Sequence, residues 1–280
     1  MPAAHAKDNP MIIASYLDLD GQPQTLSLDF FTFPGGEIHA TAETGAPASS
    51  LSLCAHLRDA GSIISLLLAT DALRRAYPGI PLELCLPYVP YARQDRVANP
   101  GEALSAKVFC NLINQQGYSR VRIQDPHSDV VAALLERVEV EDPLPALRRA
   151  LEAIGPATLV APDAGARKRV LKLAQLLGCP AVCADKIRDT VTGKISGIEL
   201  HGELPDSPLL VVDDICDGGG TFVGLAEAIA ARRAASGQTG PLYLYVTHGI
   251  FSRGLDRLLE HFDAVFARND WSGDARCRLV

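Results

Sequence analysis

The clearest signal of fold class in this chain is the stretch Leu209-Leu210-Val211-Val212-Asp213-Asp214-Ile215-Cys216-Asp217-Gly218-Gly219-Gly220-Thr221. Its apolar start predicts a buried strand, the adjacent carboxylates follow at the strand end, and the glycines precede a predicted helix from about Thr221 to Arg233. Ligands of open α/β sheets bind at the carboxyl ends of strands. Glycines let backbone N–H groups close on a phosphate, and a helix N-terminus adds partial positive charge. The stretch therefore predicts a phosphate site in an α/β domain.

The carboxylates need a separate explanation, because they would repel a phosphate. Asp213 and Asp214 are suited to accept hydrogen bonds from the two hydroxyls of a ribose, directly or through a metal ion. Together with the glycine turn, they favour a ribose 5-phosphate; the alternative is a solvated turn after a buried strand. The Gly-Lys-Ser/Thr of a Walker loop and the GxGxxG spacing of a dinucleotide fold are both absent from the stretch.

Helix and strand patterns alternate on both sides of this stretch, which predicts βαβ units and mostly parallel sheets. The predicted strands are 11–19, 25–33, 82–86, 120–124, 158–161, 209–212 and 242–246, and the predicted helices are 62–76, 105–116, 166–177, 221–233 and 253–260. The charged segment Val138–Pro145 contains two prolines and lies midway. We expect a domain boundary there, giving domains 1–139 and 140–280.

The composition excludes several classes of protein. A net charge of -7 over 280 residues argues against binding nucleic acid, which requires clustered Lys and Arg. The longest apolar run, Ile63–Ala69, is too short to span a membrane. Residues 1–10 show no signal-peptide pattern, so a cytoplasmic location is expected. The seven cysteines form no CxxC pair, which favours buried free thiols over a metal site.

Short motifs along the chain are collinear with those of one enzyme family. They are Phe33-Pro34-Gly35-Gly36-Glu37, Pro87-Tyr88-Val89-Pro90-Tyr91-Ala92-Arg93-Gln94-Asp95-Arg96, Leu104-Ser105-Ala106-Lys107, Asp125-Pro126-His127, Pro162-Asp163-Ala164-Gly165, Asp185-Lys186-Ile187-Arg188, Val211–Thr221 and Thr247-His248-Gly249-Ile250-Phe251. In this order they resemble the motifs of ribose-phosphate pyrophosphokinases. The glycine stretch alone also resembles the motif of type I phosphoribosyltransferases.

The resemblance implies an α/β fold of two tandem type I phosphoribosyltransferase-like domains, each a mostly parallel sheet flanked by helices. The first domain would lie on the ATP side and make subunit contacts, and the second would carry the ribose 5-phosphate loop. The implied reaction transfers the β,γ-diphosphoryl group of ATP to the 1-hydroxyl of ribose 5-phosphate, with Mg²⁺ as cofactor. A homo-oligomer, dimer or hexamer, is implied as well.

The resemblance also implies the residue roles. The implied catalytic residues are Lys186 and Arg188, and the implied metal ligands are His127 and Asp163. The residues implied to bind ATP are Phe33, Glu37, Arg93, Gln94, Asp95 and His127. Ribose 5-phosphate binding falls to Asp213, Asp214, Asp217, Gly218, Gly219, Gly220 and Thr221. Each has a plainer interpretation, such as a solvated charged loop around Lys186 or a structural histidine at position 127.

Three departures from the family pattern bear on function. Gly35 stands where the hairpin usually carries Asp, which weakens the case for strict adenine selectivity. Gly218 replaces a Thr whose hydroxyl contacts phosphate. The segment 97–103 diverges where allosteric members bind ADP, so we predict weak or absent ADP inhibition at that site. Two alternatives stay open: a non-catalytic regulatory subunit of such an enzyme, or a phosphoribosyltransferase that consumes its product.

Overall fold

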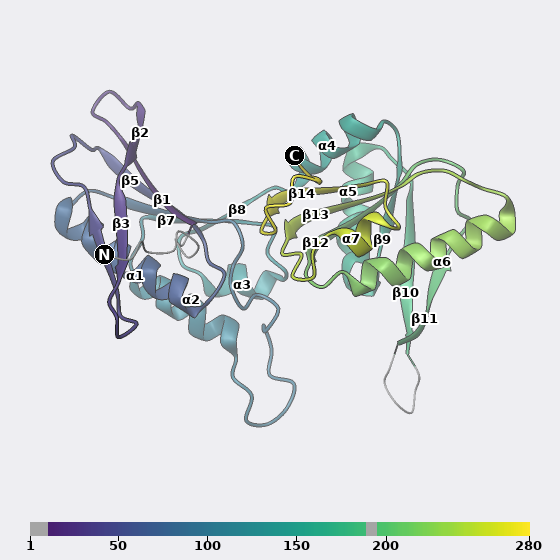
Figure 1. Ribbon diagram of the computed structural model, residues 1–280, viewed down its shortest axis with the longest axis horizontal. Helices are drawn as coiled ribbons and strands as arrows, with labels where there is room; N and C mark the ends of the chain where they lie inside the picture. The colour runs from purple at the N-terminus through teal and green to yellow at the C-terminus, as the bar shows by residue number, and fades with distance from the viewer. Residues whose placement is uncertain (1–10, 189–194) are drawn as a thin grey trace. The chain divides into compact units, whose positions relative to one another are not determined.

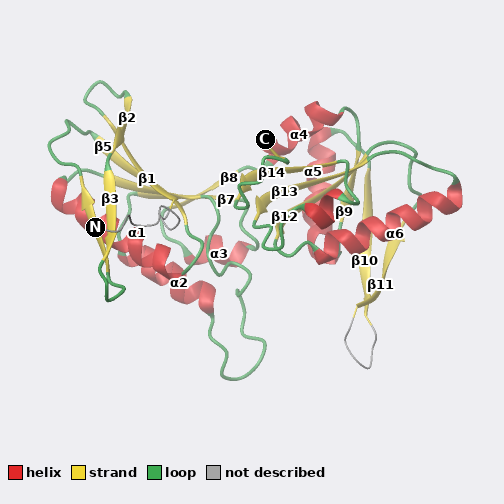
Figure 2. Ribbon diagram, viewed as in Figure 1, coloured by secondary structure: helices red, strands yellow, loops and turns green. Residues whose placement is uncertain are grey.

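The computed structural model describes residues 11–188 and 195–280, with backbone alone for Met11, Lys186, Ile187, Arg188, Ile195 and Ser196 (Figure 1). The chain divides into two compact units, the first ending at Glu141 and the second beginning at Asp142. Each unit holds its own sheet and its own helices (Figure 2).

The first unit is built on a six-stranded sheet in the order β2-β1-β5-β6-β7-β8. Its elements are β1 (Met11–Leu17), β2 (Pro23–Leu26), β3 (Leu28–Thr32), β4 (Ile38–Ala42), β5 (Ser50–His56), α1 (Ala60–Ala76), β6 (Leu82–Leu86), α2 (Ser105–Gln115), β7 (Arg120–Gln124), α3 (Asp129–Leu134) and β8 (Val138–Glu141). Strands β5 to β8 run parallel, whereas β1 is antiparallel to both of its neighbours. Strands β3 and β4 form a separate two-stranded hairpin.

The second unit has a seven-stranded sheet in the order β11-β10-β9-β12-β13-β14-β15. Its elements are α4 (Leu144–Ile154), β9 (Thr158–Ala161), α5 (Ala164–Leu177), β10 (Ala181–Arg188), β11 (Ile195–His201), β12 (Leu209–Cys216), α6 (Gly220–Ser236), β13 (Leu242–Gly249), α7 (Asp256–Leu259), β14 (Ala264–Asp270) and β15 (Cys277–Leu279). Only the β10–β11 pairing is antiparallel among the described strands of this sheet.

Strand β12 explains why this sheet is covered on both faces. Successive side chains of a strand point to opposite faces. Leu209 and Val211 belong to one hydrophobic core, and Leu210 and Val212 belong to another. A strand that is apolar at every position is typical of a parallel sheet buried between two helix layers. The predicted fold class is therefore confirmed.

Several sequence-based element predictions were wrong in detail. The segment 25–33 was predicted as one strand, but β2 and β3 belong to different sheets. The helix predicted over 253–260 is the short α7, because Arg253 belongs to a tight turn in which the Gly254 N–H donates to the Phe251 carbonyl (2.8 Å). The segment 138–145 holds β8 and the start of α4.

Strand β5 was not predicted, although its sequence alternates regularly. Its Leu51, Leu53 and Ala55 are buried, and the residues between them are half-buried. Helix α1 begins just after it with a reciprocal cap: the Ser62 N–H donates to Asp59 Oδ1 (2.7 Å), and the Asp59 N–H donates to Ser62 Oγ (3.1 Å). Such a cap satisfies backbone donors that the helix leaves unpaired.

Candidate functional site

The carboxyl end of β12 delivers two carboxylates side by side. Asp214 is buried, with 3% of its surface exposed, and Asp213 is half-buried. The Asp214 N–H donates to Asp213 Oδ1 at 2.9 Å, which fixes one carboxyl group against the backbone of the next residue. Two adjacent carboxylates with little access to water need cations or hydroxyl donors nearby.

Arg169, on α5, supplies one such cation. Its Nη2 lies 3.1 Å from Asp214 Oδ1 and 3.8 Å from Asp213 Oδ1. Burial raises the pKa of Asp213, and the neighbouring charge of Asp214 raises it further, while Arg169 acts in the opposite direction. The pair is therefore a buried acidic site that a cation or a hydroxyl donor would stabilise.

The glycine turn follows directly and leads into α6. Gly219 is the N-cap of the helix and has a φ of 76°, which favours glycine. A Cβ there would also lie 3.2 Å from Leu258 Cδ2, so α7 packs closely beneath the turn. Gly218 and Gly220 are exposed, which leaves the backbone at the start of α6 accessible to a ligand. This arrangement is a helix N-terminus open to a phosphate.

The segment after β13 holds the turn from the other side. The N–H groups of Ile250 and Phe251 donate to the Cys216 carbonyl at 2.9 and 3.1 Å. Ser252 donates twice to Asp217, from its N–H to the carbonyl (3.2 Å) and from Oγ to Oδ1 (2.6 Å). The carboxylate of Asp217 is thereby oriented by a serine hydroxyl at the edge of the turn.

Asp163 lies where β9 ends and α5 begins. Its Oδ1 accepts the Ala166 N–H at 3.1 Å and caps the helix. A carboxylate at the end of a strand is an oxygen donor of the kind that Mg²⁺ prefers. Among the described residues, no group of three His, Cys, Asp or Glu side chains is arranged to hold a metal by itself. The donors present fit a magnesium ion held by one or two carboxylates together with substrate phosphates.

The residues predicted to bind ATP lie in the first unit, on segments that leave β6, β7 and the β3–β4 hairpin. Arg93 and Gln94 are exposed, and Asp95 is half-buried. Tyr91 has a φ of 63° and its carbonyl accepts the Gln94 N–H (2.8 Å), so a tight turn presents these side chains. His127 follows β7 and is exposed.

The β3–β4 hairpin carries Phe33 and Glu37 at its tip. The Phe33 N–H donates to the Glu37 carbonyl at 2.8 Å, which closes the turn. Phe31 and Phe33 are 57% and 48% exposed and contact each other edge to face, with ring centroids 5.0 Å apart. An exposed aromatic pair at a hairpin tip is a surface suited to a base or to another chain.

The predicted catalytic residues Lys186 and Arg188 lie on β10, and their side chains fall outside the described part of the structure. Their neighbour Asp185 is described. Its Oδ2 is 2.6 Å from Arg167 Nη2 and 2.8 Å from His201 Nε2, and the hydrogen bonds from His201 and Arg167 lower the pKa of Asp185. Asp185 therefore ties β10 to α5 and to β11.

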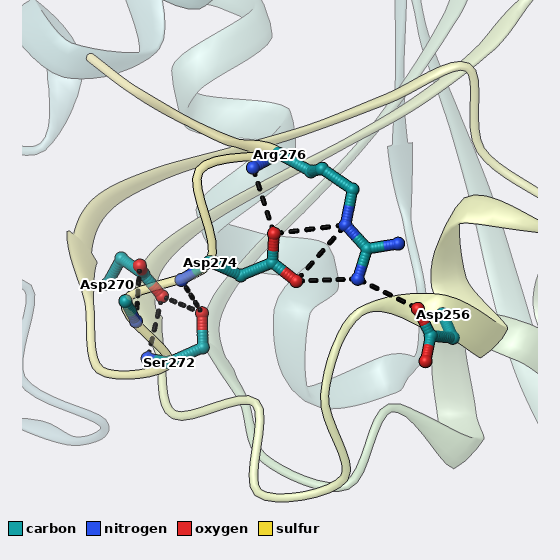
Figure 3. A network of polar contacts seen from close by, with 6 residues as sticks. Asp256, Asp270, Ser272, Asp274 and Arg276 are labelled. Carbon is teal, nitrogen blue, oxygen red and sulfur yellow. Dashed lines mark hydrogen bonds and ion pairs between the residues drawn. The ribbon is translucent and has the colours of Figure 1, made fainter.

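A polar network fixes the C-terminal turn of the second unit (Figure 3). The Asp270 carboxylate accepts the N–H groups of Ser272 and Gly273, at 2.9 and 3.0 Å. Arg276 joins Asp274 (2.6 Å) to Asp256 (2.8 Å) on α7. Leu258 of α7 packs against the glycine turn, so the network that holds α7 in place also stabilises the sheet edge where that turn lies.

Asp213, Asp214, Asp217 and the turn Gly218–Thr221 lie consecutively at the end of β12, and the structure adds Arg169 and Ser252, which the sequence did not single out. Arg169 and Ser252 were missed because neither falls in a recognisable spacing relative to its partner. Only the parallel pairing of β12 with β13, with Cys216 opposite Gly249, brings Ser252 to Asp217.

Comparisons with known proteins agree with this architecture. Residues 26–117 match the family described as the N-terminal domain of ribose phosphate pyrophosphokinase, and residues 146–241 match the phosphoribosyl transferase domain. None of the described helices is both long and apolar enough to cross a membrane.

Individual relatives are similar over much of the chain. A ribose-phosphate pyrophosphokinase of Bradyrhizobium diazoefficiens is 32% identical over 69% of this chain and 60% of its own length. That of Mycoplasma genitalium is 31% identical over 76% of this chain and 63% of its own. The chain thus spans about three fifths of these relatives. The crystal structure of phosphoribosylpyrophosphate synthetase from Mycobacterium smegmatis has the same fold, with a TM-score of 0.76, 22% identity, and coverage of 92% of this chain and 86% of that one.

Proposed function

The chain belongs to the ribose-phosphate pyrophosphokinase family, and we propose that it transfers the β,γ-diphosphoryl group of ATP to the 1-hydroxyl of ribose 5-phosphate. The products are phosphoribosyl pyrophosphate (PRPP) and AMP. The observation that carries the proposal is the acidic end of β12 followed directly by an open glycine turn at the start of α6.

That edge of the sheet offers a binding group for each end of a ribose 5-phosphate, the phosphate and the ribose hydroxyls. The 5-phosphate is bound by the turn of Asp217, Gly218, Gly219, Gly220 and Thr221, which lies at the N-terminus of α6, where backbone N–H groups and the helix dipole favour an anion. Asp213 and Asp214 accept hydrogen bonds from the ribose hydroxyls. Because burial and mutual repulsion raise the pKa of Asp213, a hydroxyl donor or a cation at this pair is favourable.

The reaction forms a bond between the 1-oxygen of the sugar and the β-phosphorus of ATP and breaks the bond from that phosphorus to the oxygen bridging to the α-phosphate. AMP leaves with this oxygen, and the sugar hydroxyl loses its proton. Such transfer depends on positioning and on neutralising negative charge more than on covalent catalysis. Lys186 and Arg188 are proposed to supply positive charge to the transferring group.

ATP is proposed to bind through the exposed side chains of the first unit, Phe33, Glu37, Arg93, Gln94, Asp95 and His127. The base would lie against the aromatic tip of the hairpin, and the phosphates would meet Arg93 and His127. His127 in the first unit and Asp163 in the second are each proposed as a ligand of Mg²⁺, which would neutralise phosphate charge when bound. The proposal also includes a homo-oligomer in the cytoplasm, and weak or absent ADP inhibition because segment 97–103 diverges from the allosteric members.

The experiment incubates the protein with ATP, ribose 5-phosphate and Mg²⁺ and separates the products by anion exchange, with Lys186→Ala as comparison. Equal amounts of AMP and PRPP, lost in the variant, are expected. Tight association with an active relative and no turnover would instead favour a regulatory subunit. That rival draws its support from Gly35, which leaves the hairpin without the usual acidic side chain.

A further inference from the structure

Arg253 lies against the glycine turn, although nothing in the sequence pattern singled it out. A Cβ built on Gly218 would be 3.6 Å from both Cδ and Nε of Arg253 and 4.0 Å from its Cγ. A Cβ at position 218 would therefore be in van der Waals contact with the Arg253 side chain, and the further atoms of a larger side chain would compete with it for space. Its guanidinium stands beside the backbone that is proposed to bind phosphate.

The local backbone fixes this position. The segment 250–252 is hydrogen-bonded to Cys216 and Asp217, and the turn closed by Gly254 and Phe251 follows at once. Phe251 itself is buried, and its ring packs so closely on Gly249 that a Cβ there would overlap the ring. Arg253 is thus carried by an anchored turn and not by a loose loop.

The charges of the site leave a role for this side chain. Asp213, Asp214 and Asp217 place carboxylates around a turn that is to receive a phosphate dianion. Arg169 is paired with Asp213 and Asp214. Within the described parts of the chain, by contrast, no salt bridge involves Arg253, and its side chain is exposed. Guanidinium groups bind phosphate oxygens through two parallel hydrogen bonds, which a neutral turn cannot match.

Building on the proposed function, we infer that Arg253 binds the 5-phosphate of ribose 5-phosphate and takes the place of a side-chain donor at Gly218. Gly218 and Arg253 then depend on each other, because a larger residue at position 218 would displace the Arg253 side chain from the phosphate. Arg253 acts on substrate affinity and not on the transfer step, since the 5-phosphate is remote from the reacting 1-hydroxyl.

The test uses the full-length protein and its variants Arg253→Ala, Arg253→Lys and Arg257→Ala. Arg257 is an exposed arginine on α7, so its removal changes the net charge equally and serves as the matched control. Binding of ribose 5-phosphate is measured by titration calorimetry, and turnover is measured separately with both substrates varied.

Arg253→Ala is expected to weaken ribose 5-phosphate binding and raise its KM by about 10- to 100-fold, the range for a lost hydrogen bond to a charged group. The kcat and the KM for ATP should stay close to those of the wild type. The affinity of Arg253→Lys for ribose 5-phosphate should lie between those of the wild type and Arg253→Ala. Its ammonium group keeps the charge but lacks the two parallel N–H donors of the guanidinium. Arg257→Ala should change affinity by less than about twofold, because exposed charges are screened.

Gly218→Thr provides a second, independent test. Alone it should weaken binding by displacing the arginine, whereas in the Arg253→Ala background it should restore part of the affinity through its hydroxyl, so the two changes are non-additive. If Arg253→Ala binds ribose 5-phosphate like the wild type while the wild type makes PRPP, the inference is overturned and the proposed function stands. If the wild type neither binds the sugar phosphate nor turns over, both are overturned.

Discussion

Replacing Arg169 by alanine tests the electrostatics of the acidic site. The change removes the guanidinium 3.1 Å from Asp214 and leaves two carboxylates at a buried strand end. Removing one partner of a buried ion pair costs roughly 3–5 kcal/mol. The Arg169 side chain is 23% exposed and that of Asp213 is 16% exposed, so solvation of the remaining carboxylates by water reduces this free-energy cost. We expect the free energy of unfolding of the second unit to fall by about 2–4 kcal/mol.

The loss should depend on pH in a defined direction. Folding raises the pKa of Asp213, so the contribution of this group is fully present below its unfolded pKa and is lost as pH rises through the folded one. Without Arg169 the pKa rises further. The deficit of Arg169→Ala should therefore be larger at about pH 8 than at about pH 5, where the carboxyl of folded Asp213 is largely protonated in both the wild type and the variant.

The assay is urea unfolding followed by the fluorescence of Trp271, the single tryptophan of the chain, which lies in the second unit. Lys168→Ala, an exposed neighbour on α5, is the matched control and should stay within about 0.5 kcal/mol of the wild type. Adding Asp214→Asn to Arg169→Ala should recover part of the loss. A deficit that is equal at both pH values would refute the reasoning.

Three further predictions concern separate parts of the fold. Asp163→Asn keeps the helix cap, so the free energy of unfolding should change by less than about 0.5 kcal/mol. The Mg²⁺ concentration for half-maximal activity should rise roughly 10-fold or more. An unchanged Mg²⁺ requirement would contradict a metal role for Asp163. Gly249→Ala should cost about 3 kcal/mol of stability because its Cβ would overlap Phe251, and urea unfolding like that of the wild type would exclude this packing. Tyr118→Phe removes the 2.6 Å hydrogen bond to Thr70 and should cost about 1 kcal/mol near neutral pH. Burial raises the pKa of Tyr118 to about 12, so the wild type loses the stabilisation from this group as the pH rises from about 10. The difference in the free energy of unfolding between wild type and variant should therefore narrow in this range. Unfolding measured at alkaline pH tests this.

Strand β12 and the glycine turn after it were the easiest part of the chain to predict from the sequence. Strand β12 is apolar at four successive positions, and its acidic end and glycine turn are contiguous, so the local pattern contains both the element and its site. Arg169 and Arg253 lie on other elements. Only the packing of α5 against the sheet and the turn after β13 bring them to β12, and no local spacing encodes that.

In the first unit, a strand was missed although its pattern is regular. The buried Leu51, Leu53 and Ala55 of β5 alternate with Ser52, Cys54 and His56, which is the pattern of a half-buried strand. Ser27 separates β2 from β3, where the chain passes from one sheet to another within a run that looks continuous in sequence. Tertiary context decides such segments, since pairing and burial outweigh intrinsic strand preference.

The central claim is tested most directly by the fate of the β-phosphate. The protein is given ATP carrying radioactive phosphorus in that position, together with ribose 5-phosphate and Mg²⁺, and the products are separated by anion exchange. Attack at the β-phosphorus predicts that the label appears in PRPP, in an amount equal to the AMP formed. Label retained in ADP would mean transfer of the γ-phosphoryl group alone and would contradict the account.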